Sequence, residues 1–184
     1  MDIEIFRRPL QTIGLCVAVS LLLLAGAHLF ERVGGLPPCT LCLDQREAHW
    51  AAAAAGGLTL LLARMGTGQR TLASALGALT LLYLFSAGLA GYHAGVEWGF
   101  WPGPATCTAA GKDDLASSSD LLASLSAPAD GVSCSDAAWR MAGISMAGYN
   151  TLISAGLAVI ALFACTGVAQ TIRNDKIGAP HLVH

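Results

Sequence analysis

Residues 71–96, TLASALGALTLLYLFSAGLAGYHAGV, contain no Asp, Glu, Lys or Arg. A helix needs roughly 17–25 apolar residues to cross a bilayer, so this stretch is long enough by itself. Residues 13–30 and 141–172 are uncharged runs of the same kind. Residues 48–63 form a shorter run, and its helix is expected to begin near Leu43. The pattern predicts four transmembrane helices.

The composition supports a membrane protein. Only 12% of the 184 residues are charged, whereas a soluble domain carries about 25%. The net charge of −2 gives no indication of nucleic-acid binding. We expect one all-α domain over residues 1–184, a four-helix transmembrane bundle. Its predicted helices cover about 13–31, 43–63, 71–95 and 143–169, with outer loops at about 32–42 and 96–142.

The first apolar run is expected to remain in the protein as a helix. Arg7 and Arg8 would suit the basic start of a signal peptide, but the run that follows is long for one. It ends in His28-Leu29-Phe30-Glu31-Arg32 rather than in a small-x-small cleavage site. An uncleaved transmembrane segment is therefore predicted.

The positions of Lys and Arg predict the orientation, because positive charge is retained on the cytoplasmic side. One side would hold both termini and the turn between the second and third helices, with six basic residues: Arg7, Arg8, Arg64, Arg70, Arg173 and Lys176. The other side would hold the two outer loops and four basic residues: Arg32, Arg46, Lys112 and Arg140. We expect cytoplasmic termini and outward-facing loops.

Those loops contain two pairs of cysteines. Cys39-Thr40-Leu41-Cys42 follows two prolines and leads into the second helix. An oxidising compartment permits disulfides there. In thiol–disulfide exchange one sulfur needs a lowered pKa. Cys42 would lie in the first helical turn, where the helix dipole favours an anion, and Arg46 would lie on the same face. We therefore expect Cys42 to be the stabilised sulfur and Cys39 to be the one free to exchange.

Cys107 and Cys134 have two interpretations. Closing a loop of this size by a disulfide contributes roughly 3–4 kcal/mol, so a structural bridge is plausible in isolation. The nearby Cys-x-x-Cys favours a redox role instead. Zinc would need two further ligands at a suitable spacing, which the pattern does not supply. Cys16 and Cys165 lie within apolar runs and are expected to be small hydrophobic side chains.

Arg46 and His93 are candidates for binding an acceptor near the Cys-x-x-Cys. Arg46 could stabilise an anion beside Cys42, or only extend its side chain to the interface. His93 is predicted at the outer end of the third helix, near the same plane. It is expected either as a neutral, hydrogen-bonded histidine or as a donor to a carbonyl ligand.

The sequence resembles the disulfide bond formation protein B (DsbB) family. The likeness is carried by PPCTLCLDQR at 37–46, YHAGVEWGFWPGPATC at 92–107, a second loop cysteine and GISMAGYN at 143–150. It extends over essentially the whole chain, with the two cysteine pairs in the family's order. The family has Glu before the arginine in many members, whereas this chain has Gln45.

The resemblance implies a bacterial inner-membrane thiol:quinone oxidoreductase whose active face is periplasmic. Such a protein reoxidises a DsbA-like thioredoxin-fold oxidase and passes the electrons to ubiquinone or menaquinone. Cys107 would form the mixed disulfide with that partner, and Cys134 would connect to Cys39. Cys42 would then engage the quinone.

The same resemblance implies that Arg46 stabilises the thiolate–quinone pair, and it relates His93 loosely to a histidine near the quinone.

Three other classes of membrane protein share part of this sequence pattern. Proteins resembling vitamin K epoxide reductase are also quinone-linked, but there the loop cysteines precede the Cys-x-x-Cys. A membrane metal-binding or transport protein could use Cys39, Cys42 and His93. A membrane scaffold with inert disulfides would need none of these side chains for activity.

Overall fold

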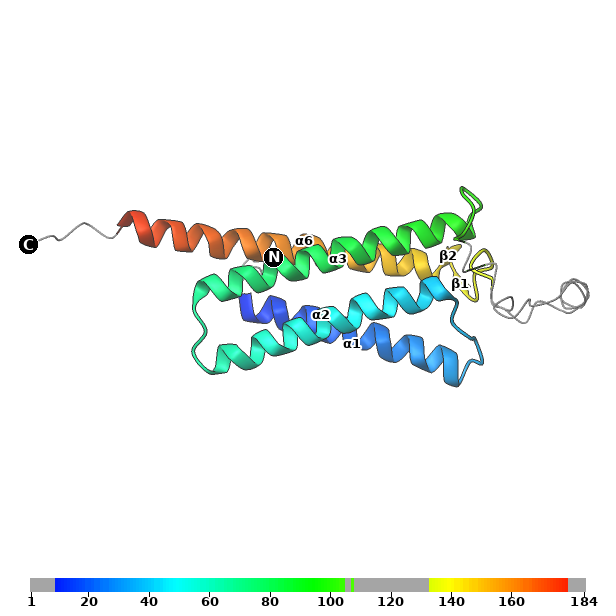
Figure 1. Ribbon diagram of the computed structural model, residues 1–184, viewed down its shortest axis with the longest axis horizontal. Helices are drawn as coiled ribbons and strands as arrows, with labels where there is room; N and C mark the ends of the chain where they lie inside the picture. The colour runs from blue at the N-terminus through cyan, green and yellow to red at the C-terminus, as the bar shows by residue number, and fades with distance from the viewer. Residues whose placement is uncertain (1–8, 105–106, 108–132, 179–184) are drawn as a thin grey trace, which may run out of the picture.

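The computed structural model describes residues 9–104, 107 and 133–178 (Figure 1). In these residues the chain forms four long helices, α1 (Pro9–Arg32), α2 (Thr40–Arg64), α3 (Gln69–Glu97) and α6 (Met146–Gly178). A two-stranded antiparallel sheet, β1 (Arg140–Met141) and β2 (Ile144–Ser145), immediately precedes α6. Residues 120–125, for which the sequence pattern predicts a short amphipathic helix, lie outside the described residues.

The helices run up and down along an elongated bundle (Figure 1). α1 packs against α2, and α6 lies along α3. The end of α1, the start of α2, the end of α3 and the start of α6 therefore meet at one end of the bundle, together with the sheet. This end carries both cysteine pairs.

Three of the described helices, α1, α3 and α6, are long and apolar enough to cross a membrane. α2 has 25 residues, but its first turns are polar. Many large apolar side chains lie on the outer surface of the bundle, among them Leu22, Leu81, Phe85 and Phe163. An apolar exterior is what a bundle surrounded by lipid presents.

The interior combines apolar packing with polar side chains. Ile13, Leu76 and Leu79 are fully buried in its main cluster. Small residues bring the helices close: a Cβ added at Gly56 of α2 would lie 2.5 Å from the Val17 side chain of α1. Close approach through small residues is the usual packing of helices in lipid.

Four helix boundaries differ from the predicted ones by three residues or more. α1 begins at Pro9 rather than at 13, and α6 ends at Gly178 rather than at 169. α2 begins at Thr40, three residues before Leu43, because the Cys39 sulfur accepts a hydrogen bond from the Cys42 amide and caps the helix. α6 begins at Met146 rather than at 143, because the preceding residues form the hairpin. Ala142 and Gly143 have φ of 50° and 81°, as a tight two-residue hairpin turn requires.

Candidate functional site

The two sulfurs of the Cys-x-x-Cys lie at the start of α2. Cys39 is the extended residue before the helix, and its sulfur accepts from the Cys42 backbone amide at 3.3 Å. The Cys39 and Cys42 sulfurs are 2.9 Å apart and both are thiols. Cys39 is buried and Cys42 is partly exposed. A disulfide between them would require only a small movement of the side chains.

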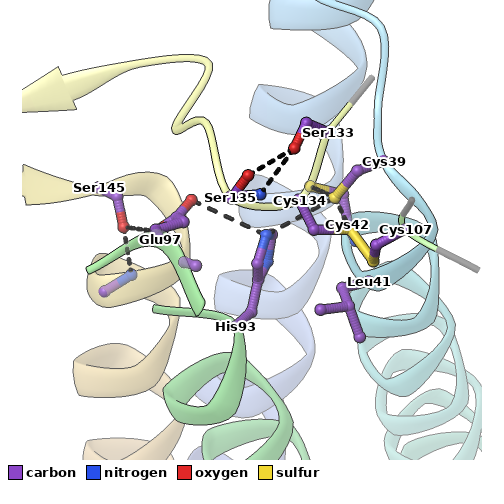
Figure 2. A network of polar contacts seen from close by, with 12 residues as sticks. Cys39, Leu41, Cys42, His93, Glu97, Cys107, Ser133, Cys134, Ser135 and Ser145 are labelled. Carbon is purple, nitrogen blue, oxygen red and sulfur yellow. Dashed lines mark hydrogen bonds and ion pairs between the residues drawn. A yellow bond between two sulfur atoms is a disulfide. The ribbon is translucent and has the colours of Figure 1, made fainter. Parts of the chain in front are cut away.

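The second pair lies against the first. Cys107 and Cys134 form a disulfide, and both are buried. The Thr40 hydroxyl lies 3.2 Å from the Cys107 sulfur and 3.8 Å from the Cys134 sulfur. Figure 2 shows the four cysteines grouped around the first turn of α2. The structure thus brings together all four cysteines that the sequence identified.

The electrostatics favour an anion on Cys39. The hydrogen bond between the two sulfurs lowers the pKa of Cys39 to about 4, and the hydrogen bond with His93 contributes. Cys42 has its pKa raised, first by its hydrogen bond to Cys39 and then by burial. In the reduced pair the Cys42 amide and the His93 ring both lie beside the Cys39 sulfur, so the contacts favour the anion on Cys39 rather than on Cys42, where helix position and Arg46 predicted it.

His93 lies between a sulfur and a carboxylate (Figure 2). Its Nε2 is 3.6 Å from the Cys39 sulfur and 3.8 Å from Glu97 Oε1. The other carboxylate oxygen of Glu97 accepts from the Ser145 hydroxyl, which also caps α6 by accepting from the Gly148 amide. The α3 and α6 ends are thus joined directly beside the cysteines.

Arg46 lines the site but is paired elsewhere. Its guanidinium donates to the Glu31 carboxylate and to the Ala27 carbonyl, both on α1. The hydrogen bonds that the structure describes for Arg46 thus go to a neighbouring helix, and its role beside Cys42 stays a prediction. The spacing in α2 placed Arg46 one turn from Cys42, but it gave no information about the acid on α1.

A cavity of about 240 Å³ opens beside the cysteines. Its polar end includes Cys39, Cys42, Arg46 and His93. Its opposite wall is apolar and comes mainly from α1 and the loop that follows, with Leu22, Leu23, Gly26, Ala27, Phe30, Leu36 and Pro37. A flat ring with polar substituents and an apolar chain would match these two kinds of lining.

Three polar residues to which the sequence pattern assigns no role continue the site into the bundle. Gln45 contacts His93 and Asn150, and Asn150 contacts His49. His49 further contacts the Ser20 hydroxyl. Gln45 and His49 are four residues apart on α2, so they lie on the same face of the helix. Two polar residues at this spacing near the start of a membrane-length helix indicate a polar contact inside the bundle. No comparable sequence pattern marks Asn150.

Comparison with known proteins agrees with the resemblance. A family profile described as disulfide bond formation protein DsbB matches residues 9–164. The chain is also 29% identical over 168 residues to disulfide bond formation protein B of Polaromonas sp. (strain JS666 / ATCC BAA-500), covering 89% of this chain and 93% of that protein. No solved structure matches the chain.

Proposed function

The chain belongs to the DsbB family of disulfide bond formation proteins, and we propose that it is a thiol:quinone oxidoreductase. It would oxidise a periplasmic DsbA-like dithiol partner and deliver the electrons to ubiquinone or menaquinone. The observation that carries this proposal is the shared position of three features. The Cys107–Cys134 disulfide, the Cys39–Cys42 pair and the cavity all meet at the first turn of α2.

The loop disulfide suits the exchange with the partner. A thiolate of the partner attacks Cys107 and forms a mixed disulfide, while Cys134 leaves as a thiolate. The second partner sulfur then displaces Cys107, so that the partner leaves as a disulfide. The two electrons remain on Cys107 and Cys134, which are now thiols.

The next exchange transfers those electrons to the start of α2. Cys134 attacks Cys39 in an oxidised Cys39–Cys42 pair, and Cys42 becomes a free thiolate. Cys107 then displaces Cys39 from Cys134, which restores the loop disulfide. The contacts of Thr40 with both loop sulfurs place them next to Cys39, and this proximity supports a direct transfer.

The intermediate with Cys39 bonded to Cys134 changes the role of Cys42. The main cause of the raised pKa of Cys42 is its hydrogen bond to Cys39. That bond is lost once Cys39 is in a disulfide with the loop. Cys42 then faces the cavity as the available anion, close to Arg46. The negative charge is thus on Cys39 in the reduced pair and on Cys42 in the intermediate with Cys134.

The cavity residues fit a quinone. A bound quinone would accept two electrons and two protons, which closes the cycle with a disulfide between Cys39 and Cys42. Arg46 would hold negative charge beside Cys42, and the Nε2 of His93 supplies a hydrogen-bonding group in the same cavity. The apolar wall from α1 suits an isoprenoid chain that enters from lipid.

We further propose that all four helices span the inner membrane, with the cysteines on the periplasmic face. The distribution of basic residues supports this orientation, since six of the ten lie at the termini and in the turn at 64–70. The common location of Cys39, Cys42, Cys107 and Cys134 around the first turn of α2 is consistent with a single active face.

The test is steady-state turnover by purified protein with a reduced thioredoxin-fold oxidase and a soluble ubiquinone analogue. The expected result is stoichiometric loss of quinone and of partner thiols. Turnover at the full rate by a Cys107→Ala/Cys134→Ala double variant would contradict the relay. Stoichiometric bound metal without quinone-dependent thiol oxidation would favour the metal-binding interpretation instead.

A further inference from the structure

A row of hydrogen bonds leads from inside the bundle to Cys39. His49 Nε2 lies 2.8 Å from Asn150 Oδ1, and Asn150 Nδ2 lies 2.8 Å from Gln45 Oε1. Gln45 Nε2 lies 2.9 Å from His93 Nδ1, and His93 Nε2 lies 3.6 Å from the Cys39 sulfur. The row crosses from α2 to α6, back to α2, and then to α3.

One backbone carbonyl fixes the direction of the whole row. The Leu41 carbonyl can only accept, and it lies 3.0 Å from the Gln45 amide nitrogen. The Gln45 nitrogen therefore donates to His93 Nδ1, and the Gln45 oxygen must accept from Asn150. The Asn150 oxygen then accepts from His49 Nε2. Rotating either amide by half a turn would set oxygen against oxygen.

The protonation of His93 follows from this direction. Since Nδ1 accepts from Gln45, the proton of a neutral His93 is on Nε2, which faces Cys39 and Glu97. The side-chain amides of Gln45 and Asn150 donate and accept, but they do not ionise. The row consequently transmits polarisation rather than protons, and aligned hydrogen bonds strengthen one another in a buried environment.

We propose that Gln45 is a positioning residue that, held by Asn150 and His49, keeps His93 as the neutral Nε2–H tautomer and aims its hydrogen bond at Cys39. The Nε2–H of the neutral ring then donates to the anion on Cys39. The importance of this row for turnover rests on the proposed function, whereas the protonation of His93 and the ionisation of Cys39 can be measured without any quinone.

The proposal also bears on metal binding. The ligand atoms of Cys39, Cys42 and His93 lie within 4.8 Å of one another, close enough to surround a metal ion. A histidine that binds a metal usually donates its other ring N–H to an acceptor. Here the other nitrogen faces a donor, Gln45, so the surroundings of His93 are of the wrong polarity for a metal ligand.

Several charged or titratable groups lie near Cys39 and His93, and a test of Gln45 must leave them unchanged. Cys42 on α2 and Glu97 on α3 face Cys39 and His93 directly. Arg46 on α2 and Asp136, which precedes β1, line the same cavity. Variants at Gln45 leave each of these groups in place.

The first test reads the tautomer. Full-length protein with ¹⁵N-labelled histidine, reduced at the Cys39–Cys42 pair, is studied by NMR in detergent micelles, and loss of a signal in His93→Gln assigns His93. At pH 7 the expected signals are an unprotonated Nδ1 and a protonated Nε2. In Gln45→Glu both nitrogens should be protonated, because a carboxylate beside Nδ1 raises the pKa of an imidazole. An imidazolium or an Nδ1–H form in the parent protein overturns the proposal.

The second test measures the ionisation of Cys39 in the full-length protein, reduced at the Cys39–Cys42 pair with Cys42 left in place, and follows Cys39 by peptide mass spectrometry. Gln45→Leu should reduce the ionisation constant of Cys39 about tenfold, on the order expected for weakening a hydrogen bond to a charged group. Asn150→Leu, one link further away, should reduce it less. The pH dependence of alkylation gives each value.

Thr80→Val is the matched control for the second test. Its hydroxyl is buried and donates to the Leu76 carbonyl within α3, away from the row. It should leave the ionisation of Cys39 unchanged. An unchanged constant in Gln45→Leu with native helix content, or an equal change in Thr80→Val, overturns the proposal. Absent quinone reduction with the expected tautomer would contradict only the proposed function.

Discussion

The Cys39 sulfur accepts a hydrogen bond from the Cys42 backbone amide at 3.3 Å, so the sulfur itself caps α2. A helix N-terminus presents unpaired N–H groups and a positive dipole end, both of which stabilise an anion. The Cys42 thiol and His93 lie beside the same sulfur. An amide, a thiol and an imidazole therefore converge on one sulfur, and each prediction below tests a consequence of this arrangement.

The reactivity of Cys39 should be nearly independent of pH above the acidic range. A pKa of about 4 keeps the sulfur ionised from pH 5 to pH 8, whereas alkylation of a thiol of pKa 9.0 falls about tenfold per pH unit below its pKa. Iodoacetamide labelling of the reduced protein, followed by peptide mass spectrometry, measures this profile. A tenfold decrease per unit between pH 8 and pH 5 would show that Cys39 is an ordinary thiol.

The same pKa predicts how acid affects the reduced protein. The pKa of Cys39 in the folded protein, about 4, lies below the ordinary thiol pKa of 9.0. An ionised Cys39 therefore stabilises the fold fully above pH 9, and this contribution decreases on acidification until it is lost below pH 4. Thermal unfolding at pH 4.5 and 7.5, compared between the parent and Cys39→Ser, should show a larger difference at pH 7.5.

Each of the four cysteines at the site should be essential for turnover. Replacing one of them by Ala breaks a two-electron pair, so that quinone reduction should fall to background in Cys39→Ala, Cys42→Ala, Cys107→Ala and Cys134→Ala. Steady-state absorbance of the quinone measures this. Cys16→Ala and Cys165→Ala are the controls, because both lie along the helices away from the site and should retain most of the activity. Normal turnover by Cys39→Ala would favour the scaffold interpretation.

Thr40→Val should slow the transfer between the two pairs. Valine keeps the branched shape but removes the hydroxyl that contacts both loop sulfurs. We expect transfer to slow severalfold while the Cys107–Cys134 disulfide still forms. Rapid acid quenching followed by alkylation and mass analysis resolves the redox state of each pair. Thr40→Ser should restore the rate, and an unaltered rate in Thr40→Val would exclude a role for the hydroxyl.

Arg46→Ala should weaken quinone binding more than it affects the partner. Its guanidinium lines the cavity and is held there by Glu31 and the Ala27 carbonyl. The apparent KM for the quinone should rise about tenfold, as expected for losing a charge-assisted hydrogen bond, with little change in the KM for the partner. Glu31→Gln should raise the quinone KM by a smaller factor. Unchanged KM values in Arg46→Ala would exclude the role proposed for Arg46.

Tyr83→Phe should destabilise the bundle without altering the ionisation of Cys39. The Tyr83 hydroxyl is buried, donates to the Cys16 carbonyl at 2.9 Å and contacts Ser20 at 2.8 Å. Removing it deletes two hydrogen bonds, each worth about 0.5–1.5 kcal/mol. Thermal unfolding in detergent measures the loss, and alkylation of Cys39 provides the internal control. No change in the unfolding temperature would mean that water replaces the hydroxyl.

The helices could be predicted because each is encoded locally. The uncharged run at 71–96 determines α3 almost to the residue, since apolar length alone is sufficient. The start of α2 differed because a cysteine is not a usual capping residue. The hairpin before α6 differed because its only signal is the pair Ala142-Gly143 within an apolar segment.

The sequence predicts those parts of the site whose chemistry belongs to a single residue type, here cysteine. The cysteines were identified by their number and spacing, and the structure brings them together. The partner of Arg46 and the lower pKa of Cys39 depend on contacts between helices, which local spacing does not encode. The row through Gln45 and Asn150 joins residues 105 positions apart, and only the packing of α2 on α6 reveals it.

The Cys107–Cys134 disulfide is fastened to the bundle at its two ends, through Thr40 and the buried cluster that contains Cys39. The geometry of exchange therefore rests on contacts that the two cysteines themselves make with the start of α2. A substitution elsewhere that keeps Thr40 and this cluster should keep the loop disulfide in place for exchange.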